Sequence, residues 1–346
     1  MGSPAAKSAY LAWLARALSR RPIEPAARAG VDVVMGYATG YDAADVAPFV
    51  RSLRAVHGGP VVMVVDPSPD FSAFLAAHDV EAVAAPQSEG WRPHPVMGRF
   101  AAYDRLLAAR DDVRNVLLTD VRDVVFQASP FAPAPAPDRL EVFSEDDDRP
   151  LGRHAFNMKH LRALIGDEMA EALSDKPCLC VGTVLGPAAE ARRLCRLILT
   201  LGAVPRSEVG GCFGADQAAF NLAVHLGLIQ AEVRANHSRV ATVGLSAGQG
   251  LSISPDGLRN PDGSLSAIVH QYDRHPTLVD VVHERWGRGL HRRERRRPTT
   301  LAARGRRLMD SVARRTPELR EGRTATGVSR RSSQALRTAT GAADIQ

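Results

Sequence analysis

Short β-branched apolar runs alternate with amphipathic segments between residues 31 and 126, and this alternation constrains the fold more than any other feature of the chain. Runs of the first kind typically form buried strands, and segments of the second kind form helices that pack by one face. The expected strands are 31–37, 60–66, 80–85 and a fourth within 115–127, separated by helices at 42–56, 71–79 and 96–112. This order predicts an α/β fold with an open, mostly parallel sheet flanked by helices.

Later segments extend the same pattern. Further strands are expected at 139–146 and 178–186, and helices at 158–173 and 189–202. Ligands of open α/β sheets bind beyond the carboxyl ends of the strands, and Asp120 falls at such an end.

The charge of the chain divides it into parts. The net charge is +6, yet the residues from 285 onward contain 17 Arg and only 5 Asp or Glu. We therefore expect three regions: an amphipathic N-terminal helix within 1–30, an α/β domain over 31–284, and an Arg-rich tail over 285–346 that is helical or disordered.

The spacing of the cysteines and the hydropathy of the chain indicate in which cellular compartment the protein lies. Cys178, Cys180, Cys195 and Cys212 lack the spacing of a zinc knuckle or a redox pair, which favours reduced thiols in a cytosolic protein. No apolar run approaches the roughly 20 residues that cross a bilayer. We expect a cytoplasmic protein, with peripheral contact of the basic tail with the inner face of a membrane as an added possibility.

The stretch "NVLLTDVRDVVFQ" places Asp120, Arg122 and Asp123 between two apolar runs. Charged side chains are rarely buried without a partner, so the three either pair with other groups or face a ligand. Two carboxylates at a strand end suit a hard divalent cation, whose remaining positions water and phosphate oxygens can fill. The same two acids also suit one cation and one ribose hydroxyl.

Other polar groups accompany these acids. Asp216 and Gln217 begin an apolar helix in "GADQAAFN", where the Asp alternatively serves as an N-cap. His270 lies in "VHQYDRHP", which gathers five polar or titratable side chains after a strand. Arg99, in the helix before "NVLLTD", could reach a diphosphate or lie on a solvated helix face.

Five segments taken together carry a resemblance: "RFAAYDRLL", "NVLLTDVRDVVFQASPF", "CVGTVLG", "GADQAAFN" and "IVHQYDRHP". In order and spacing they resemble nucleotide-sugar glycosyltransferases of the GT-A fold, within a set that shares "DVRDVVFQ" and "HQYDR" signatures. The resemblance covers roughly residues 31–280. It implies a hexosyltransferase-like enzyme that uses a nucleotide-sugar donor and a glycan or glycoconjugate acceptor.

The resemblance also implies a metal. Asp123 and His270 would bind Mn²⁺, or Mg²⁺ in its place, and Asp120 would contact the metal or the ribose. Arg99 and Arg122 would lie near the diphosphate, where positive charge stabilises the leaving group.

Two further groups of residues follow from the resemblance. Asp216 and Gln217 would be the catalytic acid–amide pair beside the donor sugar and the acceptor. The remaining donor-binding residues would be Gly36, Tyr37 and Thr39 for base and ribose, and Gly182 and Thr183 for the sugar.

The motif departs from the usual Asp-x-Asp spacing because Arg122 occupies the third position. In an extended segment Asp120 and Arg122 share one face, so Asp123 joins Asp120 only if the backbone turns after the strand. Arg122 would pair with Asp123 or Glu145, or would supply part of the positive charge at the diphosphate.

Two other functions remain open at this point. A sugar-nucleotide nucleotidyltransferase normally carries a basic residue in the glycine-rich loop after the first strand, and "MGYATGYD" has none. A protein that binds an anionic surface or nucleic acid through its tail is the second alternative. Only Trp286 offers base stacking there, which disfavours nucleic acid.

Overall fold

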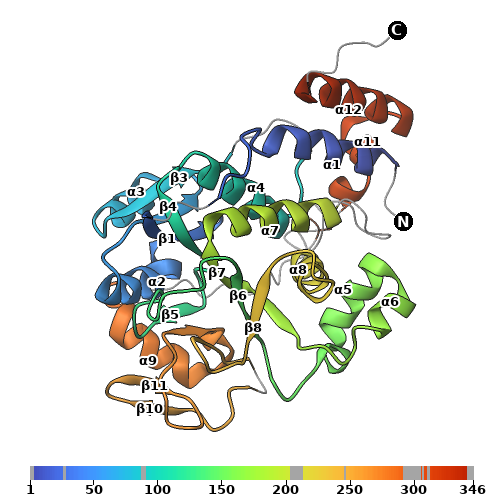
Figure 1. Ribbon diagram of the computed structural model, residues 1–346. Helices are drawn as coiled ribbons and strands as arrows, with labels where there is room; N and C mark the ends of the chain where they lie inside the picture. Colours follow the sequence, from blue (N-terminus) through green and yellow to red (C-terminus); the bar gives the residue numbers. More distant parts are fainter. Residues whose placement is uncertain are drawn as a thin grey trace.

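The computed structural model describes residues 4–25, 29–86, 91–202, 213–244, 247–290, 305, 308–309 and 312–340 of the 346-residue chain (Figure 1). Its helices are α1 (Pro4–Ala17), α2 (Ala43–Val56), α3 (Pro69–Ala76), α4 (Pro95–Ala108), α5 (Ala155–Ile165), α6 (Asp167–Glu171), α7 (Ala188–Leu201), α8 (Ala215–His225), α9 (Pro276–Trp286), α11 (Pro317–Glu321) and α12 (Ala325–Thr340), with 3₁₀ turns η1 (Leu151–Arg153) and η2 (Tyr272–Arg274). Its strands are β1 (Val31–Ala38), β2 (Val61–Val65), β3 (Val80–Ala84), β4 (Val113–Thr119), β5 (Val124–Phe126), β6 (Leu140–Ser144), β7 (Leu179–Pro187), β8 (Ala231–Arg234), β9 (Val240–Thr242), β10 (Ser252–Ser254), β11 (Gly257–Arg259) and β12 (Ile268–His270).

A seven-stranded sheet in the order β3-β2-β1-β4-β7-β6-β8 forms the centre, which confirms the predicted mostly parallel α/β architecture. Only β7 runs against its neighbours, β4 and β6. The chain passes from β1 outward to β2 and β3, then returns to β4 on the other side of β1. The carboxyl ends of β1 and β4 therefore lie at the point where the strand order reverses, which is where such sheets bind ligands.

Alternate side chains of the strands enter two apolar layers. Val33 and Met35 of β1 pack with residues of α4, α7 and α8, whereas Val34 packs with residues of α2 and α3 on the opposite face. Helix α2 begins at Asp42 because its carboxylate accepts hydrogen bonds from the backbone NH groups of Ala44 and Asp45. Burial on both faces explains why the strands are continuously apolar.

The segment that follows β4 leaves the sheet. Residues 121–123 form a bend, and β5 then pairs antiparallel with β12 in a separate three-stranded sheet, β5-β12-β9. The backbone turn that Asp123 requires to approach Asp120 is therefore present. The pairing of β5 with β12 also brings His270 next to this turn, because His270 is opposite Val124.

One predicted helix is wrong in its extent. The segment 158–173 was expected to be a single helix, but it contains α5 and α6, divided at Gly166. Gly166 has a φ of +89°, a backbone conformation that side-chain-bearing residues rarely adopt, so the helix ends there.

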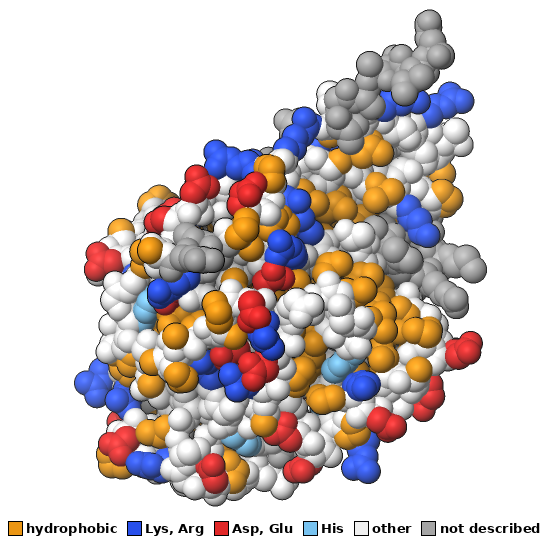
Figure 2. Space-filling model, in the orientation of Figure 1, with side chains coloured by type: hydrophobic (Ala, Val, Ile, Leu, Met, Phe, Trp, Pro, Cys, Tyr) orange, Lys and Arg blue, Asp and Glu red, His pale blue; other side chains and the backbone are white. Residues whose placement is uncertain are grey.

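The first and the last described helices, α1 and α12, pack together. Figure 1 shows the two side by side at one end of the molecule. The hydroxyl of Tyr10 in α1 donates to the carbonyl of Leu199, and Trp91 Nε1 donates to the carbonyl of Arg314. Figure 2 shows Lys and Arg side chains distributed over this end. The Arg-rich stretch 291–300 lies outside the described residues.

Within the described part of the chain, none of the helices has the length and apolar character needed to cross a membrane. Cys178, Cys180 and Cys195 are buried free thiols, as expected, and Cys212 lies outside the described residues.

The ion pairs of the buried Asp104 offer a test of how the helices are held together. Its carboxylate is fully buried and accepts from Arg192 Nε at 3.2 Å, Arg196 Nε at 3.0 Å and the backbone NH of Ser19 at 2.8 Å. Asp104→Ala leaves buried guanidinium charge without its partner, and we expect a loss of about 3–5 kcal/mol in the free energy of unfolding. Urea denaturation measures this loss.

The matched control is Asp111→Ala. Asp111 is 93% exposed and lies 3.8 Å from Arg21, so its removal should cost about 0–1 kcal/mol. Equal unfolding midpoints for the two variants would contradict the role of Asp104.

Candidate functional site

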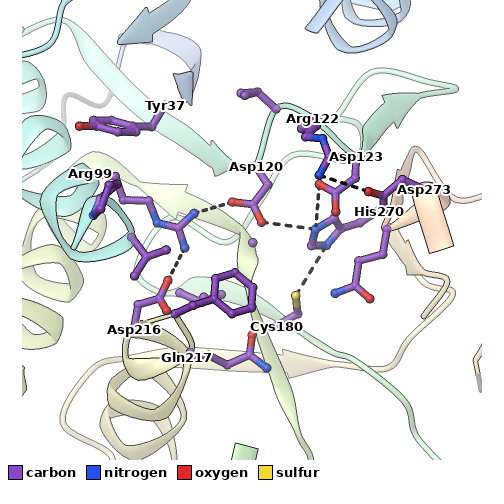
Figure 3. A pocket seen from close by; sticks show the side chains of 18 of the residues that line it. Tyr37, Arg99, Asp120, Arg122, Asp123, Cys180, Asp216, Gln217, His270 and Asp273 are labelled. Atoms are coloured by element: carbon purple, nitrogen blue, oxygen red, sulfur yellow. Dashed lines mark hydrogen bonds and ion pairs between the residues drawn. The ribbon is translucent and has the colours of Figure 1, made fainter. Parts of the chain in front are cut away.

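A cavity of about 320 Å³ opens beyond the carboxyl ends of β1 and β4 (Figure 3). Ten of the twelve residues predicted to form the site line it: Tyr37, Thr39, Arg99, Asp120, Arg122, Asp123, Gly182, Asp216, Gln217 and His270. These residues come from six separate segments of the sequence. The fold brings together in one cavity side chains that were selected from the sequence alone.

The other two predicted residues, Gly36 and Thr183, lie behind the cavity wall. A Cβ added to Gly36 would stand 2.3 Å from Cγ1 of Val121, so this glycine makes room for the residue after Asp120. Thr183 is fully buried in β7, opposite Thr119. Gly36 therefore shapes the cavity through its neighbour Val121, which lines it.

Asp120 and Asp123 both face one nitrogen of His270. Nε2 lies 3.5 Å from Oδ2 of Asp120 and 3.8 Å from Oδ1 of Asp123, and the imidazole is almost completely buried. Figure 3 shows His270 between these carboxylates and the thiol of Cys180. The three groups form one cluster despite the unusual spacing of the acids.

The charges in this cluster shift one another's pKa. Burial raises the pKa of Asp120, but the charge of Arg99 and the hydrogen bond from His270 outweigh it and lower the pKa to about 2. Burial lowers the pKa of His270, yet Cys180 and the two carboxylates hold it well above its ordinary value. Burial, with Asp120 and Asp273 nearby, raises the pKa of Asp123.

The donor atoms of this cluster fit a divalent cation. The ligand atoms of Asp120, Asp123 and His270 all lie within 4.8 Å of one another, so two carboxylates and one imidazole could hold a single metal ion. Nδ1 of His270 lies 3.6 Å from Sγ of Cys180, so an outer partner fixes the ring with Nε2 toward the acids.

Gly182 is the residue that allows this cluster to form. A Cβ at this position would lie 2.4 Å from Cε1 of His270 and 2.6 Å from Oδ2 of Asp120. Both distances are far shorter than any real contact, so a larger residue would push the imidazole or the carboxylate out of place.

Cys180, His270 and a carboxylate are also arranged like a catalytic triad. In such a triad a thiol is the nucleophile, a histidine is its base and an acid orients the histidine. The environment of the thiol argues against that chemistry. Burial raises the pKa of Cys180 despite the opposing influence of His270, so the thiolate that would act as nucleophile is disfavoured. The arrangement favours Cys180 as the partner that orients His270.

Arg122 is directed at an acid that the sequence analysis did not select. Its Nη1 lies 3.7 Å from Oδ2 of Asp273, rather than beside Asp123 or Glu145 as expected. Arg122 still lines the cavity and is about one-third exposed, so it adds positive charge at the rim.

Arg99 connects the end of β4 with the start of α8. One of its terminal nitrogens donates to Asp120, and the other donates to Oδ2 of Asp216 at 2.7 Å. Burial lowers the pKa of the guanidinium, but both carboxylates raise it and the net shift is upward. Asp216 is therefore an ion-pair partner and is not the N-cap of α8, which is Gly214.

Glu145 lies behind the wall and orients two amides of the cavity. Nε2 of Gln217 donates to Oε2 of Glu145 and to Oδ1 of Asn157, both at 3.1 Å. Nε2 of Gln271 donates to Oε1 of Glu145 at 3.3 Å. Because a carboxylate only accepts, both amide nitrogens must face Glu145, and the carbonyl oxygens point elsewhere. Sequence reasoning missed this role, since Glu145 belongs to an ordinary-looking acidic run.

Two aromatic side chains stand at the mouth of the cavity. Phe156 is 50% exposed and Phe213 is 65% exposed, and their ring centroids are 5.9 Å apart. Figure 2 shows apolar side chains over the part of this face where α5 and α8 lie. A second hollow of about 810 Å³ adjoins the cavity, shares Tyr37 and Thr39 with it, and includes Trp13 of α1.

Comparison with known proteins adds no relative. No model of a protein family matches the chain, and no curated protein matches it.

The close approach at Gly182 yields a testable prediction. Gly182→Ala should displace His270 or Asp120 and weaken Mn²⁺ binding at least about tenfold, the loss seen when an outer partner of a metal ligand is removed. Isothermal titration with Mn²⁺ measures the affinity.

Gly98→Ala in α4 is the control, because a Cβ there meets nothing within 4 Å. Alanine is also the better helix former, so this variant should fold and bind Mn²⁺ normally. Unchanged Mn²⁺ affinity in Gly182→Ala would contradict the prediction that this cluster is the metal site.

Proposed function

We propose that the chain is a metal-assisted glycosyltransferase of the GT-A type. It would transfer a sugar from a nucleoside-diphosphate sugar to a hydroxyl group of a glycan or glycoconjugate. The observation that carries the proposal is the convergence of Asp120, Asp123 and His270 in one cavity at the switch point of the sheet.

Asp120, Asp123 and His270 would hold Mn²⁺ or Mg²⁺, and a bound cation would neutralise charge on the diphosphate as the bond to the sugar breaks. Arg122 lines the same cavity and would place a second positive charge near the leaving group. Arg99 would have a mainly structural role, because its guanidinium is already paired with Asp120 and Asp216.

Gln217 would contact the sugar, and Asp216 would hold the helix that carries Gln217. Gln217 lines the cavity with its amide nitrogen held by Glu145, so its carbonyl oxygen would accept a hydrogen bond from a substrate hydroxyl. Asp216 would keep the first turn of α8 against Arg99. The exposed rings of Phe156 and Phe213 would pack against the apolar face of an acceptor sugar.

Tyr37, near the end of β1, and Thr39, which follows the strand, would receive the base and ribose, in line with the resemblance. The described loop after β1 carries no basic residue, so a nucleotidyltransferase is the weaker alternative. We place the enzyme in the cytoplasm and propose that its basic tail contacts anionic membrane surfaces.

A panel of UDP-, GDP- and CMP-sugars with Mn²⁺ tests the proposal. One donor should release its nucleotide slowly by hydrolysis and faster with an acceptor, and a chelator should abolish both rates. Asp123→Asn should lower the rate at least about 100-fold through lost metal affinity.

Asp111→Asn is the matched control because its side chain is almost fully exposed. No binding or release with any donor, or full activity in Asp123→Asn, would reject the proposed function.

A further inference from the structure

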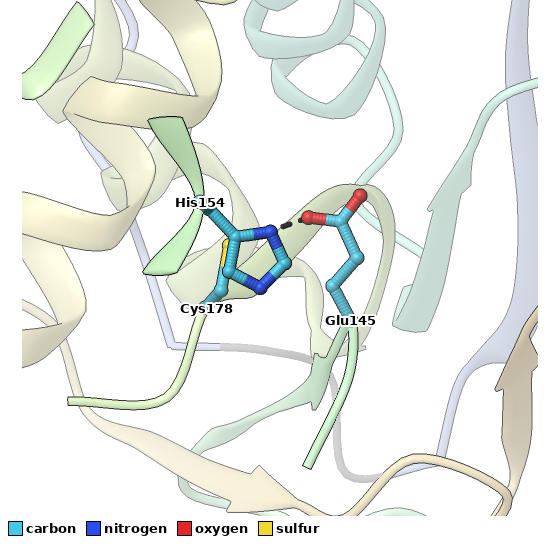
Figure 4. A group of neighbouring side chains, drawn as sticks. All are labelled: Glu145, His154 and Cys178. Carbon is cyan, nitrogen blue, oxygen red and sulfur yellow. Dashed lines mark hydrogen bonds between the residues drawn. The ribbon is translucent and has the colours of Figure 1, made fainter. Parts of the chain in front are cut away.

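A second group of ligating side chains lies behind the cavity wall. Glu145 follows β6, His154 precedes α5 and Cys178 precedes β7, and Figure 4 shows the three side chains next to one another. Their ligand atoms all lie within 4.8 Å of one another. The residues are far apart in the sequence, which explains why cysteine spacing did not indicate a site.

The backbone and one hydrogen bond hold Glu145 and Cys178 together. The NH of Glu145 donates to the carbonyl of Cys178 at 2.7 Å, and Sγ of Cys178 donates to Oε2 of Glu145 at 3.3 Å. The thiol is completely buried. Its proton therefore lies between a sulfur and a carboxylate oxygen, where a cation would bind both atoms.

The ring of His154 is set for the same role. Nε2 lies 2.9 Å from the carbonyl oxygen of Arg149, which can only accept, so Nε2 carries the hydrogen. In the neutral ring the other nitrogen, Nδ1, then carries a lone pair, and Figure 4 shows a ring nitrogen turned toward Glu145. Metal-binding histidines are commonly held in this way by a carbonyl on the second nitrogen.

Asn157 supports the group from outside. Its Nδ2 lies 2.8 Å from Sγ of Cys178 and 3.3 Å from Oε2 of Glu145. Donation of an amide hydrogen to sulfur stabilises a thiolate, the form that binds metal. Burial and the adjacent Glu145 raise the pKa of the Cys178 thiol.

From these contacts we propose that Glu145, His154 and Cys178 form a Zn²⁺ site distinct from the oxygen-rich site at Asp120. One thiolate, one imidazole and one carboxylate match the ligands that zinc prefers, with a fourth position for water. The two negative ligands neutralise the dication, which limits the cost of burying charge.

A zinc ion there would stabilise the cavity. Glu145 also accepts the hydrogen bonds that orient Gln217 and Gln271, both of which line the cavity. Metal ligation would restrain the Glu145 carboxylate and, through it, both amides. The proposal itself stands apart from the proposed glycosyl transfer, because its readout is metal binding.

The experiment uses the full chain after removal of metals with a chelator, with Zn²⁺ and Co²⁺ as probes and excess Mg²⁺ present. We expect at least one Zn²⁺ per chain that resists dilution, and a thiolate-to-cobalt charge-transfer band with Co²⁺. Cys178→Ser should lose the band, whereas Cys180→Ser should keep it. Asn157→Ala should weaken Zn²⁺ affinity about 10–100-fold.

His154→Ala provides a second variant should Cys178→Ser fail to fold, and it should also lose tight Zn²⁺ binding. Absence of a thiolate band in the folded wild-type chain would overturn the proposal. A band that persists in Cys178→Ser, unchanged Zn²⁺ affinity in His154→Ala, or a band lost only in Cys180→Ser would overturn it equally.

Discussion

The ion pairs of Arg99 are the interaction on which the rest of the site depends. The guanidinium lies between Asp120, at the end of β4, and Asp216, in the first turn of α8; Arg99 and Asp216 are largely withdrawn from water, and Asp120 is about one-third exposed. With no cation between them, the two carboxylates would repel each other, and the buried carboxylate of Asp216 would have lost its solvation without compensation. Arg99 removes that cost and fixes α8 relative to the sheet. Asp120 is thereby left ionised, with its second oxygen directed at His270.

Around this centre, small and polar residues adjust the geometry. Gly182 leaves space for the imidazole, and Cys180 holds the nitrogen of His270 that faces away from the acids. Glu145 likewise orients the side-chain amide of Gln217 by accepting its hydrogen bond. Each of these residues acts by constraining a neighbour, so the functional side chains are restrained before any ligand arrives.

The sequence predicted the parts of the fold that depend on local pattern. Periodicity located the parallel strands, and carboxylates at a strand end indicated Asp120 and Asp123. The sequence did not predict the partner of Arg122, because the pairing of β5 with β12 is what brings Asp273 close to Arg122. Glu145 was missed for the same reason, since Gln217 and Gln271 lie 72 and 126 residues further along the chain. Gly166 shows that one residue with positive φ can divide a segment whose apolar pattern favours a single helix.

The central claim is that Asp120, Asp123 and His270 hold one divalent cation that the nucleotide of the donor also contacts. Electron paramagnetic resonance of Mn²⁺ in the wild-type chain and in His270→Gln tests it most directly. We expect one bound Mn²⁺ per wild-type chain, a tighter complex when a nucleoside diphosphate is added, and at least about tenfold weaker binding in His270→Gln. Equal Mn²⁺ affinity in the two proteins, or no response to any nucleoside diphosphate, would contradict it.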